Sequence, residues 1–76
     1  MQELFDVYFF YPDGTNTRER ENVSAERAVA FAREATQRPA VALGMLSRIM
    51  ITDKMDHCVF LWEAGKGIVF PPRESK

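Results

Sequence analysis

A single segment of this chain, between Ser24 and Pro39, has the periodicity of an amphipathic helix, and the other apolar runs are typical of β-strands. The Ser24 hydroxyl is suited to accept from the free amides of the first helical turn, and Pro39 steers the residue before it out of the helical region. A spacing of ~100° per residue puts these residues on one stripe: Ala25, Ala28, Val29, Phe31, Ala32 and Ala35. Because most of the stripe is alanine, the helix should lie close to its neighbour, with Phe31 as its one large side chain.

The strand-like runs are separated by residues that favour turns. Leu4–Tyr11 is rich in aromatic and β-branched residues and stops at Pro12-Asp13-Gly14. Proline presets φ there, and Asp and Gly tolerate left-handed backbone. The return segment, Thr15–Asn22, is polar on both faces, which is typical of a solvent-exposed edge strand. The further strands are expected at Leu46–Asp53, His57–Glu63 and Ile68–Phe70, with turns at Asp53–Asp56 and Ala64–Gly67.

This order of elements, ββαβββ, predicts an α+β domain of two layers, an antiparallel sheet of four to five strands with one helix on one face. Leu4–Tyr11 and His57–Glu63 are apolar on both sides and should be interior strands, whereas Thr15–Asn22 and Ile68–Phe70 should be edges. A crossover through the helix that starts the third strand beside the first gives the spatial order 2-1-3-4-5. The connection Pro39–Met45, apolar but interrupted by a proline and a glycine, is expected to be buried or to form one short turn.

One helix is too narrow to cover such a sheet. A helix is about 10 Å across, whereas five strands at ~4.8 Å spacing are roughly twice as wide. Yet eight of the nine aromatic residues lie in or at the ends of the strands. Asp6 and Arg48 mark the face turned away from the helix, and strand alternation puts Tyr8, Phe10 and Met50 on that same open face.

The length of the hairpin loop at residues 53–57 decides on which face of the sheet each side chain of the fourth strand lies. A three-residue loop would leave Phe60 and Trp62 on the open face, and a four-residue loop would put Val59 and Leu61 there instead. In either register the open face carries a larger apolar patch than soluble monomers usually expose. With the register left open, the candidate interaction face comprises Tyr8, Phe10, Arg48, Met50, Phe60 and Trp62.

Composition excludes several classes of protein. An apolar share of 46% and a near balance of 10 Lys and Arg against 11 Asp and Glu exclude intrinsic disorder. No run approaches the ~18 apolar residues of a membrane span, and a net charge of -1 gives little attraction for nucleic acid. The length predicts one domain over residues 1–72, with a flexible tail at 73–76. The lone Cys58 excludes an internal disulfide and, with an acidic N-terminus, indicates a cytoplasmic protein.

No motif forms a catalytic constellation. His57 and Cys58 are strand neighbours whose side chains should point to opposite faces. Asp53, Asp56 and His57 fit a hairpin loop better than a metal site. Gly65-Lys66-Gly67 precedes a strand, whereas a phosphate loop leads into a helix. We therefore expect no catalytic, metal or cofactor-binding residues.

These observations favour a small non-catalytic interaction module that forms a homodimer through its open face. A second hypothesis is a pocket for a small ligand or substrate on that face, lined by Tyr8, Phe10, Arg48 and Trp62, with Arg48 as an anion anchor. A third is contact with a different protein, on that face or by strand addition at Ile68–Phe70. Stacking of single-stranded nucleic acid on the aromatic residues is less favoured, because the chain has one helix and almost no net charge.

Overall fold

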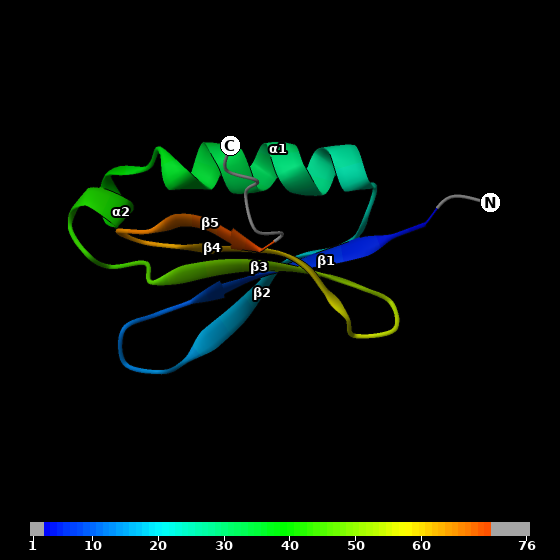
Figure 1. Cartoon of the computed structure of the whole chain (residues 1–76), viewed down its shortest axis with the longest axis horizontal. Coiled ribbons are helices and arrows are strands. Elements are labelled where there is room, and N and C mark those ends of the chain that lie inside the picture. The colour runs from blue at the N-terminus through cyan, green and yellow to red at the C-terminus, as the bar shows by residue number, and fades with distance from the viewer. Residues whose placement is uncertain (1–2, 71–76) are drawn as a thin grey trace, which may run out of the picture.

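The computed structural model describes residues 3–70, which form a five-stranded antiparallel sheet with α-helix on one side (Figure 1). The elements are β1 (Phe5–Phe10), β2 (Asn16–Val23), α1 (Ala25–Thr36), α2 (Pro39–Ala42), β3 (Arg48–Asp53), β4 (Cys58–Glu63) and β5 (Gly67–Phe70). The strands lie in the order β2-β1-β3-β4-β5, so the predicted α+β fold and strand order are confirmed. The predicted domain end at residue 72 and the tail at 73–76 lie outside the described residues.

The turn between β1 and β2 forms as its residues predict. The Asp13 carboxylate accepts hydrogen bonds from the Thr15 amide at 3.0 Å and from the Thr15 hydroxyl at 2.7 Å. Gly14 has φ of +91° and donates its amide to the Tyr11 carbonyl at 2.9 Å. This left-handed position strains any residue with a Cβ, so glycine is what permits the tight reversal.

Helix α1 begins at the predicted cap and ends earlier than predicted. The Ser24 hydroxyl accepts the Arg27 amide at 3.2 Å. The last helical residue is Thr36, and Gln37 follows as the C-terminal cap. Arg38 is extended, as expected of a residue before proline, and Pro39 then starts the separate turn α2.

The segment from Pro39 to Met45 contains the short turn that was one of two expectations, but it is not a buried connection. Leu43 and Met45 are 73% and 58% exposed. Gly44 has φ of +74°, which ends the turn, and the Met45 amide closes it on the Ala40 carbonyl at 2.8 Å. The segment therefore runs along the surface with Val41 packed against the core, and it leads to Leu46, which is buried.

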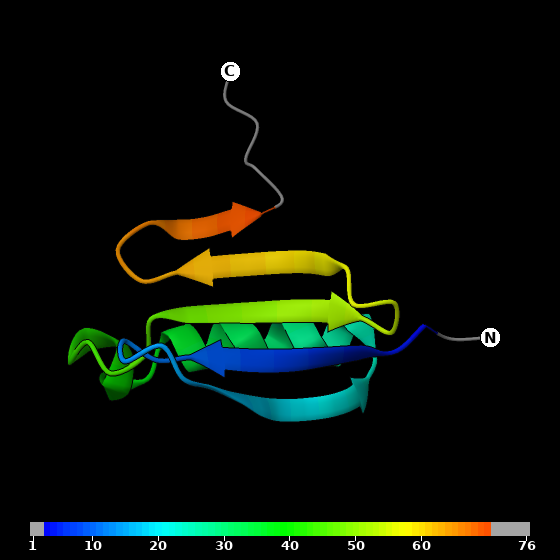
Figure 2. The same cartoon turned by 90° about the horizontal axis from the view of Figure 1, so that it is seen from below.

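The core lies between α1 and the three strands beneath it. Helix α1 contacts β1, β2 and β3, and Figure 2 shows it behind β1 and β3 but not behind β4 or β5. On the helix, Phe31 stacks on Phe9 of β1, with ring centroids 5.6 Å apart. The fully or almost fully enclosed residues are Phe5, Val7, Phe9, Ala28, Ala32, Ala35, Leu46, Ile49 and Ile51. Hydrophobic burial is thus concentrated in one half of the sheet.

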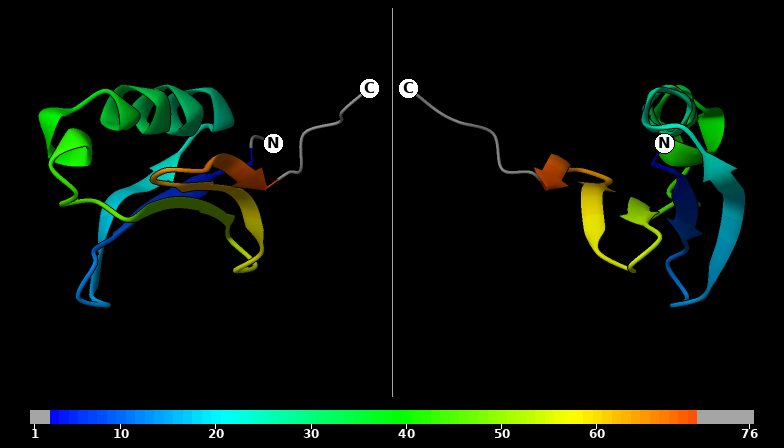
Figure 3. Two further views of the ribbon diagram at one scale, coloured as in Figure 1. Left: turned by 60° about the vertical axis from the view of Figure 1, so that its left-hand side comes forward. Right: turned by 90° about the vertical axis from the view of Figure 1, so that its right-hand side faces the viewer.

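The sheet is arched. Figure 3 shows the β1–β2 and β3–β4 hairpins bending away from α1. The face without a helix is therefore the hollow side of the arch, and no helix among residues 3–70 crosses it (Figures 2 and 3).

Candidate interaction surfaces

A β-bulge decides which face of the sheet the side chains of β4 occupy. The Asp53 amide donates to the His57 carbonyl at 3.0 Å and closes a three-residue loop, with Asp56 in the left-handed region at φ of +67°. Thr52 then pairs with Cys58 and Ile51 with Phe60, so Val59 is an extra residue that shifts the register by one.

The bulge corrects the predicted position of two candidate residues. Phe60 pairs with Ile51 and Trp62 with Ile49, and both aromatic residues pack against the core on the helix side. Of the two registers that the sequence left open, the one that put Phe60 and Trp62 on the open face is therefore wrong, and these two residues do not belong to the candidate interaction face. The loop has three residues, but the bulge after it reverses the alternation that a regular ladder would give.

The other four predicted residues lie together on the face without a helix. Tyr8 of β1 pairs with Met50 of β3, and Phe10 pairs with Arg48. Leu61 of β4 pairs with Met50 and extends the row, a residue that the sequence left undecided. We call Tyr8, Phe10, Met50 and Leu61 the open-face patch; each is partly exposed. The patch is continuous across the three central strands.

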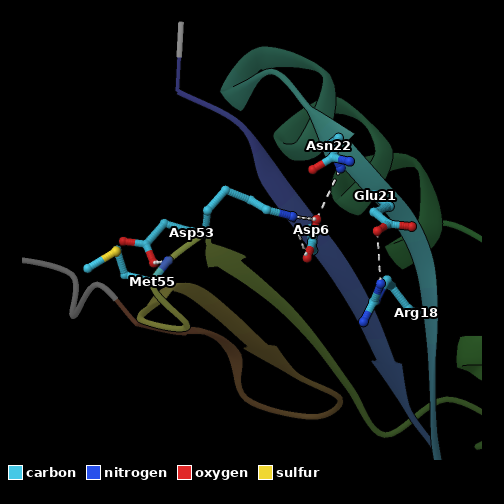
Figure 4. A network of polar contacts seen from close by, with 7 residues as sticks. Asp6, Arg18, Glu21, Asn22, Asp53 and Met55 are labelled. Atoms are coloured by element: carbon cyan, nitrogen blue, oxygen red, sulfur yellow. Dashed lines mark hydrogen bonds and ion pairs between the residues drawn. The ribbon is translucent and has the colours of Figure 1, made fainter.

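Charged pairs border the open-face patch. Arg48 lies beside Glu63, with Nε to Oε2 at 3.7 Å. The Arg18 guanidinium lies 5.7 Å from the centre of the Tyr8 ring and pairs with Glu21 at 3.1 Å (Figure 4). Arg48 thus lies at the margin of the patch, in a long ion pair with Glu63 and with about half of its side chain exposed.

One end of the same face is polar and enclosed. The Asp6 carboxylate accepts the Asn22 amide at 3.0 Å (Figure 4) and the Lys54 ammonium at 3.1 Å. Burial raises the pKa of Asp6, but the Asn22 amide and the Lys54 charge outweigh it, and the pKa falls below its usual value. Asp6 is therefore held ionised as a structural link between β1, β2 and the β3–β4 hairpin.

A second apolar surface lies on the helix side of the sheet, over β4 and β5, which α1 does not cover. Phe60 and Trp62 face a groove between α1 and the outer half of the sheet. A hollow of about 390 Å³ lies at its β3–β4 end, lined by Glu3, Phe5, Ala25, Val29, Ile51, Val59 and Phe60. A neighbouring hollow of about 270 Å³ is lined by Ala32, Arg33, Thr36, Phe60, Trp62, Gly67 and Ile68. Ala25 and Val29, which belong to the predicted apolar stripe, are exposed at this groove.

The polar residues considered for catalysis or metal binding have local roles in the β3–β4 loop. Asp53 Oδ1 accepts the amides of Met55 and His57, each at 2.9 Å. The His57 amide is the main cause that lowers the pKa of Asp53. The His57 ring is exposed, and Cys58 is partly buried with its Sγ 3.5 Å from the Phe60 carbonyl. Over residues 3–70, no three His, Cys, Asp or Glu side chains are grouped so that they could hold a metal ion.

Comparisons with protein-family models, with curated proteins and with solved structures found no match to this chain. Within the described part of the chain, no helix has the length and apolar character needed to cross a membrane.

Proposed function

We propose that this domain is a non-catalytic interaction module that forms a homodimer through its open-face patch. The observation that carries the proposal is the continuous row Tyr8–Met50–Leu61, extended by Phe10, on a sheet face that no helix of residues 3–70 covers. Aromatic residues, methionine and arginine are enriched in protein–protein interfaces relative to other surfaces. The patch and its margin have this composition.

The size of the face suits a stable dimer. Five strands about 4.8 Å apart and about six residues long outline a footprint of roughly 500 Å². The relief of the side chains brings the accessible area toward the ~800 Å² per partner of an ordinary specific interface. Two sheets stacked through these faces would place Tyr8, Phe10, Met50 and Leu61 of both copies between them, and these side chains would have to fill the hollow of each arch.

The charges around the patch favour a second copy over a strongly charged partner. Arg48 with Glu63, Lys54 with Asp6 and Arg18 with Glu21 set both signs at the margin. Two copies would therefore meet without net repulsion. A polyanion such as single-stranded nucleic acid would meet as many carboxylates as basic groups.

Sedimentation equilibrium over a range of concentrations tests the proposal. We expect the native chain to be dimeric at micromolar concentration. Met50→Glu places a carboxylate in the centre of the patch of both copies, and we expect dimerisation to weaken by about 100-fold or more, the scale of a hot-spot residue. Tyr8→Lys is a second variant, at the residue of β1 that pairs with Met50, and it should also weaken dimerisation.

Met55→Glu is the matched control. Met55 is 75% exposed in the β3–β4 loop and lies outside the patch, so this variant should dimerise like the native chain. Circular dichroism checks that each variant is folded. A native chain that stays monomeric, or a dimer that Met50→Glu and Tyr8→Lys leave unchanged, would contradict the proposal.

A second candidate function is binding of a small apolar ligand on the helix side. The pocket first expected on the open face does not form, because Trp62 lies on the opposite face from Tyr8, Phe10 and Arg48. The hollow of about 390 Å³ beside Phe60 is instead within the usual range for ligand sites and is mostly apolar. Native mass spectrometry of protein purified under mild conditions would show added mass for a bound ligand, and Val29→Trp should remove it.

A further inference from the structure

The two edges of the sheet are unequally protected against pairing with another chain. Strand β2 carries four consecutive charged residues, Arg18 to Glu21. Strand β5 reads Gly-Ile-Val-Phe and carries none. Its side chains Ile68, Val69 and Phe70 are 44%, 38% and 43% exposed. Both edge strands contain a bulge against their neighbour, so the bulge does not distinguish them; β2 is the longer and charged edge, and β5 is the shorter and uncharged one.

An edge strand presents unpaired amide and carbonyl groups, and charged side chains are a common means of preventing unwanted pairing. Within residues 3–70, β5 pairs with β4 and its other side pairs with no strand. Figure 2 shows β5 as the outermost strand, with no helix behind it. The β5 edge is therefore open to an added strand that is short and uncharged.

We propose that β5 pairs antiparallel with β5 of a second copy across a two-fold axis. The second copy presents a strand of the required kind, uncharged and apolar on both faces. Pairing with β2 of another copy would set four charges beside apolar side chains, and because that contact is head-to-tail it would leave free edges for further growth. The β5–β5 contact closes on itself.

The side chains of β5 are complementary to themselves in this arrangement. Phe70 pairs with Leu61 and Gly67 pairs with Glu63, so Phe70 and Gly67 face the same side of the sheet. In a regular strand, residues three apart face opposite sides, and the extra residue Val69 removes that difference. In a two-fold pair centred between Ile68 and Val69, each Phe70 lies opposite Gly67 of the other copy. An aromatic ring over a cross-strand glycine is a favourable pair in β-sheets.

The contact is short, so we expect it to be weaker than the open-face dimer. Four residues per strand bury less area than an ordinary specific interface, and Pro71 and Pro72, which follow in the sequence, have no amide hydrogen to lengthen the ladder. A chain that uses both surfaces would form a dimer first and assemble further at higher concentration, into a closed tetramer where the two two-fold axes intersect at right angles and into an open chain of copies otherwise.

Sedimentation velocity on four proteins separates the two surfaces. The native chain should assemble beyond the dimer, Val69→Lys should stop at the dimer, Met50→Glu should form only the edge dimer, and the double variant should be monomeric. We expect Val69→Lys to weaken the edge contact at least tenfold. Thr17→Lys, which adds the same charge to the exposed β2 edge, is the matched control and should behave like the native chain.

Hydrogen exchange of β5 supplies a second readout that does not depend on a variant. Amides of residues 68–70 should gain at least tenfold protection as concentration rises, whereas amides of β2 should not change. A Val69→Lys protein that assembles like the native chain, with β5 exchange independent of concentration, would overturn this inference and leave the open-face dimer standing. Loss of assembly in Val69→Lys with no effect of Met50→Glu would support the inference and overturn the proposed function.

Discussion

Strands β1 and β3, which lie beneath α1, and strands β4 and β5, which lie beyond it, are all rich in apolar residues but differ in burial. In β1 and β3, Val7, Phe9 and Ile49 are enclosed between strand and helix. In β4 and β5 no residue is buried, although β4 contains Phe60, Leu61 and Trp62. The comparison shows that the position of one helix divides this sheet into a part that stabilises the fold and a part that remains available for contacts.

The largest expected difference between the halves is the cost of removing an isoleucine. Ile49→Ala removes a fully buried side chain beneath α1 and should lower the free energy of unfolding by about 2–5 kcal/mol. Ile68→Ala in β5 removes a side chain that is 44% exposed and should cost about 1 kcal/mol or less. Urea denaturation at low protein concentration measures the free energy of unfolding of both variants. Equal losses of stability would contradict the division of the sheet into a buried half and an open half.

A pair of substitutions on α1 tests the same division from the helix side. Ala32 is fully buried against the sheet, so Ala32→Leu should overpack the interface and destabilise the fold by about 1–3 kcal/mol. Val29 faces the open groove, so Val29→Leu should change the stability by about 0.5 kcal/mol or less. If thermal denaturation shows Val29→Leu to be the more damaging change, the helix lies over the other half of the sheet.

The cap of α1 should matter less than its packing. Ser24→Ala removes the oxygen that accepts the Arg27 amide and should cost about 1 kcal/mol. Ser24→Asp keeps an acceptor at the same position and should restore most of the loss, since a carboxylate also suits the positive end of a helix. Denaturation curves in which the alanine and aspartate variants coincide would argue against this role of the cap.

The smallest expected effect is on the pH dependence of stability. The pKa of Asp6 is lowered in the folded state, so the unfolded chain binds the proton more readily. The stabilisation is present above about pH 4, the ordinary range of an unfolded aspartate, and is lost as the pH falls through the lower folded value. Because Lys54 is nearly half exposed, we expect a contribution of about 1 kcal/mol or less.

Asp6→Asn should flatten the acid limb of the stability curve. An acid limb as steep in Asp6→Asn as in the native chain would show that Asp6 does not link β1 to the β3–β4 hairpin through its charge.

Much of the fold could be predicted because local chemistry and global pattern agree. Asp13 and Gly14 set the first hairpin, Ser24 starts the helix, and the charge of β2 identifies an edge. Alternation in β1 and β3 placed Tyr8, Phe10 and Met50 on one face, because those two strands pair in a regular ladder.

The positions of Phe60 and Trp62 could not be predicted, since they depend on the single extra residue at Val59. A bulge reverses every side chain after it, and neither Val59 nor its neighbours carry a turn signal in the sequence. The groove beside α1 was also missed. Helical periodicity identified Ala25 and Val29 as apolar. It did not show that these two residues would border a hollow whose other side is formed by Val59 and Phe60 of β4.

Methionine methyl NMR tests the proposed dimer most directly. In a mixed sample of labelled and unlabelled chains, we expect intermolecular contacts from the Met50 methyl to aromatic rings of the other copy, and loss of its access to a soluble paramagnetic probe as concentration rises. The methyl groups of Met45 and Met55, which are 58% and 75% exposed, should stay accessible and serve as internal controls. A Met50 methyl with no intermolecular contact and unchanged access at millimolar concentration would contradict assembly through the open face.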